Sequence, residues 1–83
     1  MKLYYFAWIR EQIGKSSEEI DLPETVTTIA DLIDWLAKRG PEYKEALANR
    51  DTIKTAINQT HVSHETSLAG ATEIALFPPV TGG

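Results

Sequence analysis

The sequence ends in the residues Ile74-Ala75-Leu76-Phe77-Pro78-Pro79-Val80-Thr81-Gly82-Gly83. Their first part is an apolar run that predicts a buried strand, which we place at Glu73 to Phe77. Pro78 and Pro79 end this strand, because neither can donate a hydrogen bond to a sheet and both fix φ near the polyproline value. We therefore expect a domain over residues 1–77 and an extended tail over residues 78–83.

The predicted tail is slim and ends in two glycines. Its residues from Pro78 to Gly83 reach about 20 Å when fully extended. Gly82 and Gly83 have no side chains, so this end can enter a channel only as wide as a peptide backbone. The reactive group expected at the tip is the α-carboxylate of Gly83, presented for another protein to handle. The alternative is a frayed terminus, which most domains have.

Composition excludes several classes of protein. A chain of 83 residues with 42% hydrophobic and 24% charged residues is typical of one globular domain. No apolar run approaches the roughly 18–20 residues that span a bilayer, and the apolar N-terminal stretch reads as a strand rather than a signal peptide. We expect a cytosolic protein without a membrane partner. The net charge of −4 and the scattered lysines and arginines argue against a nucleic-acid partner.

The absence of cysteine removes a further set of chemistries. Without cysteine there is no disulfide, thiolate zinc site, iron–sulfur cluster or cysteine nucleophile. His61 and His64, with Glu65, form the one arrangement that suggests a metal. Their spacing in a strand or loop places the two rings on opposite faces, and no further ligand completes the set. We therefore expect no bound metal and interpret both histidines as solvent-facing.

The N-terminal third predicts a β-hairpin. Lys2 to Trp8 is aromatic and apolar and predicts a central strand. Arg10 to Ser17 contains Gly14 and polar residues, so we predict a turn there. Ser17 to Leu22 alternates in polarity and predicts the returning strand. Within it, we interpret Glu18-Glu19 as solvated residues and not as an acid–base pair.

The middle of the chain predicts helices. Thr28 and Asp31 have the spacing of a capping box, and Gly40 is predicted to end the helix that starts there. Pro41 is expected to begin a shorter helix that runs to about Ala48. The first helix carries one apolar stripe, formed by Ile29, Leu32, Ile33 and Leu36.

The last part predicts further strands. Ile53 to Ile57 predicts a strand, followed by a short one near His61-Val62 and a turn-rich segment from Thr66 to Thr72. With the strand at Glu73 to Phe77, the order of elements predicts an α+β fold with helix on one face of a sheet.

Three segments carry a resemblance to a known family. The chain is similar to the sulfur carriers that form the small subunits of molybdopterin synthase. The resemblance implies the ubiquitin-like β-grasp fold, a mixed sheet whose first and last strands pair in parallel at the centre. The matching segments are Phe77-Pro78-Pro79-Val80-Thr81-Gly82-Gly83, Phe6-Ala7-Trp8-Ile9-Arg10-Glu11-Gln12-Ile13-Gly14 (the pattern F-A-x-x-R-E-x-x-G) and Ile57-Asn58-Gln59-Thr60 (the pattern V-N-x-x).

The resemblance also implies a chemistry for Gly83. An ATP-dependent activating enzyme would adenylate its carboxylate, and a sulfur donor would convert the acyl-adenylate to a thiocarboxylate. The carrier would then donate sulfur to a cyclic pyranopterin phosphate, forming the dithiolene of molybdopterin. This chain has no phosphate-binding loop and is expected to bind no cofactor itself, since the activating partner uses the ATP. The implied complex is a heterotetramer of two small and two large subunits.

The same resemblance implies which residues contact the large subunit. They are Phe6, Phe77 and the residue at the position of His61, where the family often has leucine. The alternative for both phenylalanines is a place in the core. The family's acidic D-G-D-E turn is replaced here by Gly70-Ala71-Thr72-Glu73, so acidic contacts from this turn to the activating enzyme are not expected. Arg10 and Glu11 match the family pattern, and we assign them no catalytic role.

Three other functions remain open. The chain could be a carrier for thiamine, cysteine or tRNA thiolation, since the tail chemistry is shared. It could be a ubiquitin-like modifier joined through Gly83 to lysines of other proteins. It could also be an interaction domain whose tail has no role.

Overall fold

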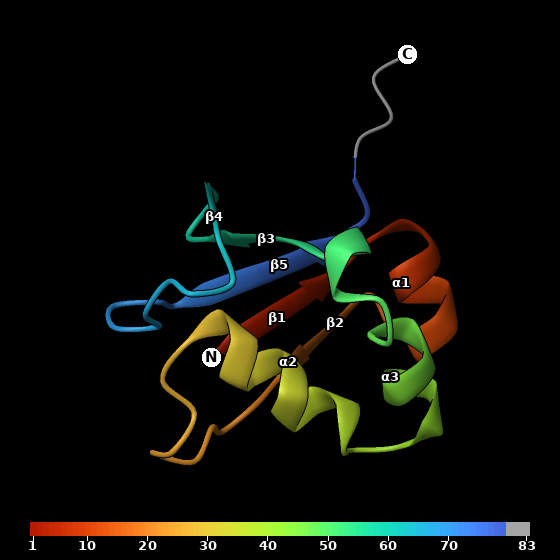
Figure 1. Cartoon of the computed structure of the whole chain (residues 1–83), viewed down its shortest axis with the longest axis horizontal. Helices are drawn as coiled ribbons and strands as arrows, with labels where there is room; N and C mark the ends of the chain where they lie inside the picture. The colour runs from red at the N-terminus through yellow and green to blue at the C-terminus, as the bar shows by residue number, and fades with distance from the viewer. Residues whose placement is uncertain (80–83) are drawn as a thin grey trace.

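The computed structural model describes residues 1–79. Val80, Thr81, Gly82 and Gly83, to which the predicted tail chemistry belongs, lie outside the described residues. The fold is a five-stranded mixed sheet with strand order β2-β1-β5-β3-β4 (Figure 1). The strands are β1 (Lys2–Tyr5), β2 (Ser17–Glu19), β3 (Lys54–Ile57), β4 (Thr60–Val62) and β5 (Glu73–Phe77), and the helices are α1 (Ala7–Ile13), α2 (Ile29–Ala37), α3 (Pro41–Ala46) and the 3₁₀ turn η1 (Arg50–Thr52).

The last strand is the centre of the sheet. β5 pairs in parallel with β1 and antiparallel with β3, and Leu3 lies opposite Ile74 in the register with β1. The bounds of β5 are those predicted from the apolar run before Pro78. The parallel pairing of first and last strands is likewise confirmed, and the fold is the ubiquitin-like β-grasp.

One face of the sheet packs against the helices. In β1 and β5 alternate residues are buried, as expected when one face of a sheet meets the core. Figure 1 shows α2 and α3 on the same side of the strands, with α1 beyond the end of β1. The single core includes the predicted stripe of α2 and residues from all three helices, namely Leu3, Tyr5, Ile9, Ile13, Ile20, Ile29, Leu32, Ile33, Leu36, Tyr43, Ala46, Leu47, Ile53, Leu68, Ile74 and Leu76.

The start of α2 is confirmed and its predicted end is wrong. The backbone N–H of Asp31 donates to Thr28 Oγ1 at 3.2 Å, and the Thr28 N–H donates to Asp31 Oδ2 at 3.3 Å. The helix ends at Ala37, and Gly40 is the N-cap of α3 with an extended φ of 170°. The reason is Pro41, which disfavours helical backbone at the residue before it.

The predicted strand to Trp8 and the turn after it are also wrong. β1 ends at Tyr5, and Ala7–Ile13 is helix α1. Ile9 and Ile13 lie one turn apart and are both buried, which holds this segment against the core as a helix. Gly14 ends it in the left-handed conformation at φ 89° and donates its N–H to the Arg10 carbonyl at 2.8 Å.

Smaller differences concern the lengths of elements. β2 stops at Glu19 rather than Leu22, although Ile20 is buried and Leu22 packs against the core. α3 ends at Ala46 rather than Ala48. No helix within residues 1–79 has the length and apolar character needed to span a membrane.

Candidate functional site: the open face of the sheet

The face of the sheet opposite the helices carries the predicted contact residues. Tyr4 on β1 lies opposite Ala75 on β5, and Ala75 lies opposite Ala56 on β3. Residues that lie opposite each other point to the same face of a sheet, so these side chains form one row. The two alanines are short and leave a shallow hollow of about 260 Å³. Its lining is Tyr4, Phe6, Ala56, Gln59, Glu73 and Ala75.

Phe6, His61 and Phe77 lie on this same face. His61 is opposite Ala56 in the register of β3 with β4, and Phe77 follows Ala75 by two positions. The rings of His61 and Phe77 are 5.2 Å apart at an interplanar angle of 48°. Phe6 is 45% exposed, so the alternative that it belongs to the core is wrong, whereas Phe77 is half-buried. The structure therefore brings the three predicted contact residues to one surface.

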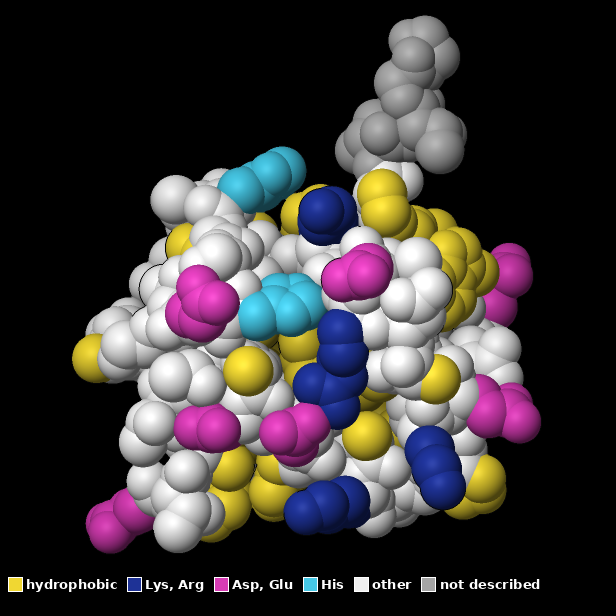
Figure 2. Space-filling model, in the orientation of Figure 1, with side chains coloured by type: hydrophobic (Ala, Val, Ile, Leu, Met, Phe, Trp, Pro, Cys, Tyr) yellow, Lys and Arg dark blue, Asp and Glu magenta, His cyan; other side chains and the backbone are white. Residues whose placement is uncertain are grey.

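The chain leaves the sheet beside this surface. Pro78 is half-buried and Pro79, the last described residue, is exposed. Figure 2 shows hydrophobic side chains gathered next to the end of the described chain, over the start of α1.

Trp8 is exposed on this side of the molecule and was not among the predicted contact residues. It is 41% exposed on the first turn of α1, and it follows Phe6 and Ala7 directly. Ala7 has a left-handed φ of 53°, which is unusual for a residue with a Cβ. The signal available in the sequence was the spacing of Ile9 and Ile13, which makes Trp8 a residue of the exposed side of a helix.

Asn58 fixes the start of β5 from the neighbouring hairpin. Asn58 and Gln59 have φ of 48° and 73° and form the tight turn between β3 and β4. Asn58 Oδ1 accepts the N–H groups of Thr72 at 2.9 Å and Glu73 at 3.1 Å, and its Nδ2 donates to the Gly70 carbonyl at 3.1 Å. This single side chain therefore ties the segment before β5 to the sheet.

The interpretation of Glu18 as a solvated residue is wrong. Its side chain is 10% exposed and accepts hydrogen bonds from the Tyr5 hydroxyl at 2.6 Å and the Tyr43 hydroxyl at 2.8 Å. Arg39 Nη1 donates to it at 2.8 Å. Burial alone raises the pKa of a carboxyl, but these three donors outweigh it and lower the pKa of Glu18 to about 2. Glu19 is exposed as predicted.

Burial and the bond to Glu18 raise the pKa of both Tyr5 and Tyr43 above the ordinary tyrosine value. This cluster joins β1, β2 and α3 and belongs to the core side of the sheet.

His64 is also placed differently from the prediction. It is half-buried, and its Nε2 lies 2.7 Å from the backbone carbonyl oxygen of Ile53. A carbonyl only accepts, so Nε2 carries the proton. His61 instead packs against Phe77 with its ring tilted, so the two histidines make different contacts. Within residues 1–79 no group of three His, Cys, Asp or Glu residues has the arrangement of a metal site.

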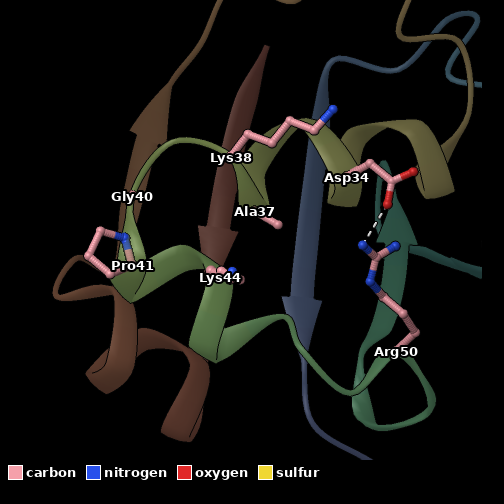
Figure 3. A pocket seen from close by; sticks show the side chains of 7 residues that line it. All are labelled: Asp34, Ala37, Lys38, Gly40, Pro41, Lys44 and Arg50. Carbon is pink, nitrogen blue, oxygen red and sulfur yellow. Dashed lines mark hydrogen bonds and ion pairs between the residues drawn. The ribbon is translucent and has the colours of Figure 1, made fainter.

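A larger hollow of about 600 Å³ lies on the helical side of the molecule (Figure 3). An ion pair between Asp34 and Arg50, 2.5 Å apart, closes one end of it. This hollow brings together no nucleophile and acid–base pair. Its lining is Asp34, Ala37, Lys38, Gly40, Pro41, Lys44 and Arg50.

The sequence matches a family model over nearly its whole length. The model of the ThiS family matches residues 3–83. The chain belongs to the ThiS family. The matched range includes the residues of the open face, the end of β5 and the last two glycines of the sequence.

Named relatives of this ThiS-family chain are similar over their full length. It is 35% identical to the molybdopterin synthase sulfur carrier subunit of Escherichia coli, with 100% of this chain and 99% of the relative covered. Identity to the protein of the same name from Haemophilus influenzae is 36%, with 100% and 99% covered. The family resemblance inferred from the sequence is therefore confirmed.

Solved structures agree with the fold. A putative molybdopterin converting factor, subunit 1, from Pyrococcus furiosus matches with a TM-score of 0.75 and 34% identity, covering 95% of each chain. SAMP1 from Haloferax volcanii matches with a TM-score of 0.73 and 29% identity, covering 100% of this chain and 98% of the other.

Proposed function

We propose that this chain is the sulfur carrier subunit of a molybdopterin synthase. The observation that carries the proposal is the full-length similarity to sulfur carrier subunits of that enzyme, at 35% and 36% identity. The Pro-Pro-Val-Thr-Gly-Gly sequence after the central strand β5 supports the same assignment. The large subunit of the synthase would be its partner.

The proposed chemistry takes place at Gly83. The carboxylate attacks the α-phosphorus of ATP on an activating enzyme, pyrophosphate leaves, and an acyl-adenylate forms. Hydrosulfide delivered by a sulfur donor then attacks the acyl carbon and AMP leaves, which yields a thiocarboxylate. The thiocarboxylate sulfur attacks a side-chain carbon of a cyclic pyranopterin phosphate held by the large subunit and displaces an oxygen from that carbon. Water then hydrolyses the acyl–sulfur bond, which leaves the sulfur on the pterin and restores the Gly83 carboxylate. The absence of a Cβ in Gly82 and Gly83 favours each step, because no side chain crowds the reacting carbon.

We assign docking on the large subunit to the open face. Phe6 and His61 are exposed and Phe77 is half-buried on this face, and aromatic side chains gathered on one surface are typical of protein interfaces. The hollow above Ala56 and Ala75 gives the partner a recess for one apolar side chain. The expected assembly contains two small and two large subunits, and the catalytic pocket belongs to the large ones.

A second candidate is a protein modifier joined through Gly83 to lysines. The solved small archaeal modifier protein 1 from Haloferax volcanii favours it, with a TM-score of 0.71 and 27% identity over 96% of this chain. The two candidates differ in product. A carrier forms a labile thiocarboxylate, whereas a modifier forms stable amide conjugates.

The deciding experiment is the intact mass of the chain after incubation with ATP, a cognate activating enzyme and a sulfur donor. We expect a gain equal to the exchange of one oxygen for one sulfur, absent in a variant that lacks Gly83. The thiocarboxylated chain, mixed with the large subunit and cyclic pyranopterin phosphate, should then yield molybdopterin. Conjugates on lysine without the sulfur exchange would favour the modifier, and an unchanged mass would contradict both.

A further inference from the structure

Phe6 and Trp8 are two large apolar side chains that lie on the surface instead of in the core. They are 45% and 41% exposed, the exposed large hydrophobics of the described chain. Trp35, the other tryptophan, is half-buried, and the Arg39 guanidinium lies 5.3 Å from its ring. Among residues 1–79 no aromatic ring or cation stacks on Trp8. Within the described residues, Trp8 therefore lacks the kind of stacking partner that Trp35 has.

The backbone around Ala7 holds Trp8 in this exposed place. Ala7 adopts a left-handed φ of 53°, which costs a residue with a Cβ roughly 1–2 kcal/mol. The turn allows α1 to start immediately after β1, and burial of Ile9 and Ile13 then leaves Trp8 on the solvent side. Such conformations persist where the surrounding structure enforces them, often at functional sites.

The turn that carries Trp8 lies beside the end of β5. The Phe6 N–H donates to the Leu76 carbonyl at 3.1 Å, so Phe6 extends the pairing of β1 with β5 by one residue. Phe77 and Pro78 follow directly. Figure 1 shows the start of α1 next to the place where β5 ends. A protein that binds the chain at the end of β5 would therefore also contact this turn.

We propose that Trp8 anchors the large subunit, and that the docking surface continues from Phe77 and Phe6 on the open face around to the first turn of α1. This inference rests on the proposed function, because the partner is the subunit that accepts the tail. The matching site on that partner is an apolar recess with a hydrogen-bond acceptor for the indole N–H. Tryptophan is among the residues most enriched in the energetic centres of interfaces.

The first test places a probe in this chain alone. The chain contains two tryptophans, so labelling it with 5-fluorotryptophan gives two ¹⁹F signals, which a Trp35→Phe variant assigns. On addition of the unlabelled large subunit, the Trp8 signal should shift and lose its sensitivity to exchange of H₂O for D₂O. The Trp35 signal should stay in place, because Trp35 lies on α2 among the helices.

The second test measures affinity for the large subunit by titration calorimetry. Trp8→Ala should weaken binding at least about tenfold, as loss of an interface anchor does. Its unfolding midpoint should stay close to that of the parent, because the side chain is exposed. The matched control is Lys44→Ala on the exposed side of α3, which should bind as the parent does.

The outcomes separate this inference from the proposed function. If the large subunit binds and Phe77→Ala weakens it, but the Trp8 signal and the affinity of Trp8→Ala are unchanged, the anchor is refuted and the carrier function stands. If the large subunit does not bind at all, both fail. A Trp8 signal that moves when the isolated chain is concentrated, and not further with the large subunit, would assign Trp8 to self-association and overturn the proposal.

Discussion

A single carboxylate, that of Glu18, joins three elements of the fold through its charge. Hydrogen bonds from Tyr5, Tyr43 and Arg39 stabilise the ionised form in a side chain that is 10% exposed. A buried carboxylate with several donors favours the folded state only while it is ionised. The stability of this domain therefore depends on pH through Glu18.

The sign of this dependence follows from the pKa of Glu18, which falls from an ordinary value of 4.5 to about 2 on folding. The stabilisation is complete above about pH 4.5 and is lost as the pH falls towards 2. We expect Glu18→Gln to lower the free energy of unfolding at pH 7 by roughly 2–3 kcal/mol. Denaturant titrations between pH 7 and pH 2 measure this.

The difference between parent and Glu18→Gln should shrink across that acid range. Glu19→Gln is the control, because Glu19 is the exposed neighbour on the same strand. An equal loss of stability in the Glu19 variant would contradict the assignment to Glu18.

The residue types predicted where helices and strands begin and end. They did not predict which side chains contact each other across the fold. Thr28 with Asp31 marked the start of α2, and Pro78 the end of β5, because capping and proline chemistry are local. Glu18 could not be assigned in this way, since its partners Tyr43 and Arg39 lie more than twenty residues away in the sequence. His64 was missed because its partner is the backbone carbonyl of Ile53, which lies before β3 and comes close only when β3 and β4 pair.

At the scale of elements, the β3–β4 hairpin positions the start of the central strand β5. Its turn residue Asn58 holds the N–H groups of Thr72 and Glu73 and the carbonyl of Gly70. Replacing it with alanine should lower the free energy of unfolding by roughly 1–2 kcal/mol, since these exposed hydrogen bonds are lost and the left-handed backbone disfavours alanine.

Asn58→Asp is the informative comparison, measured by the same denaturant titration. Aspartate keeps the acceptor for Thr72 and Glu73 and loses only the donor to Gly70, so it should cost less than alanine. Equal losses for both variants would indicate that the donor or the turn backbone, and not the acceptor, carries the effect.

The α1 helix is the element whose type was predicted wrongly from the sequence. The aromatic and apolar residues up to Trp8 alternate as in a strand, so a strand was predicted there. The helical spacing of Ile9 and Ile13, four residues apart, was overlooked for this reason. The switch occurs at Ala7, whose left-handed backbone no local propensity predicts. The predicted helix ending at Gly40 failed because Pro41 determines the backbone before it.

At the scale of the whole molecule, stability and the proposed function lie in different parts of the chain. The core is formed by residues between Leu3 and Leu76, whereas the proposed chemistry belongs to Gly83. Removal of Gly82-Gly83 should therefore change the free energy of unfolding by less than about 0.5 kcal/mol and abolish sulfur transfer. Calorimetric unfolding and the intact-mass assay measure the two effects.

A large loss of stability in this deletion would contradict the separation. Replacement of Thr81 by serine is the control, since it alters the tail without removing the final glycines, and it should leave sulfur transfer intact.

The candidate site was predictable in part because its residues follow sequence rules and family patterns. Phe6, His61 and Phe77 were proposed as contacts by resemblance, and the sheet register brings them to one face. The hollow above Ala56 and Ala75 on this face could not be foreseen, since it depends on these two alanines lying opposite each other in neighbouring strands. Which strands become neighbours is a property of the assembled sheet.

The parallel pairing of β1 with β5 has a consequence for biosynthesis. Leu3 meets Ile74 only after the strand Glu73–Phe77 has been made, so the sheet has no centre while that strand is still inside the ribosome. Such long-range contacts delay folding until this strand has left the ribosome. Any product cut short before this strand would remain unfolded and open to proteolysis. The cell would thus present no folded domain that lacks the strand leading to the glycines.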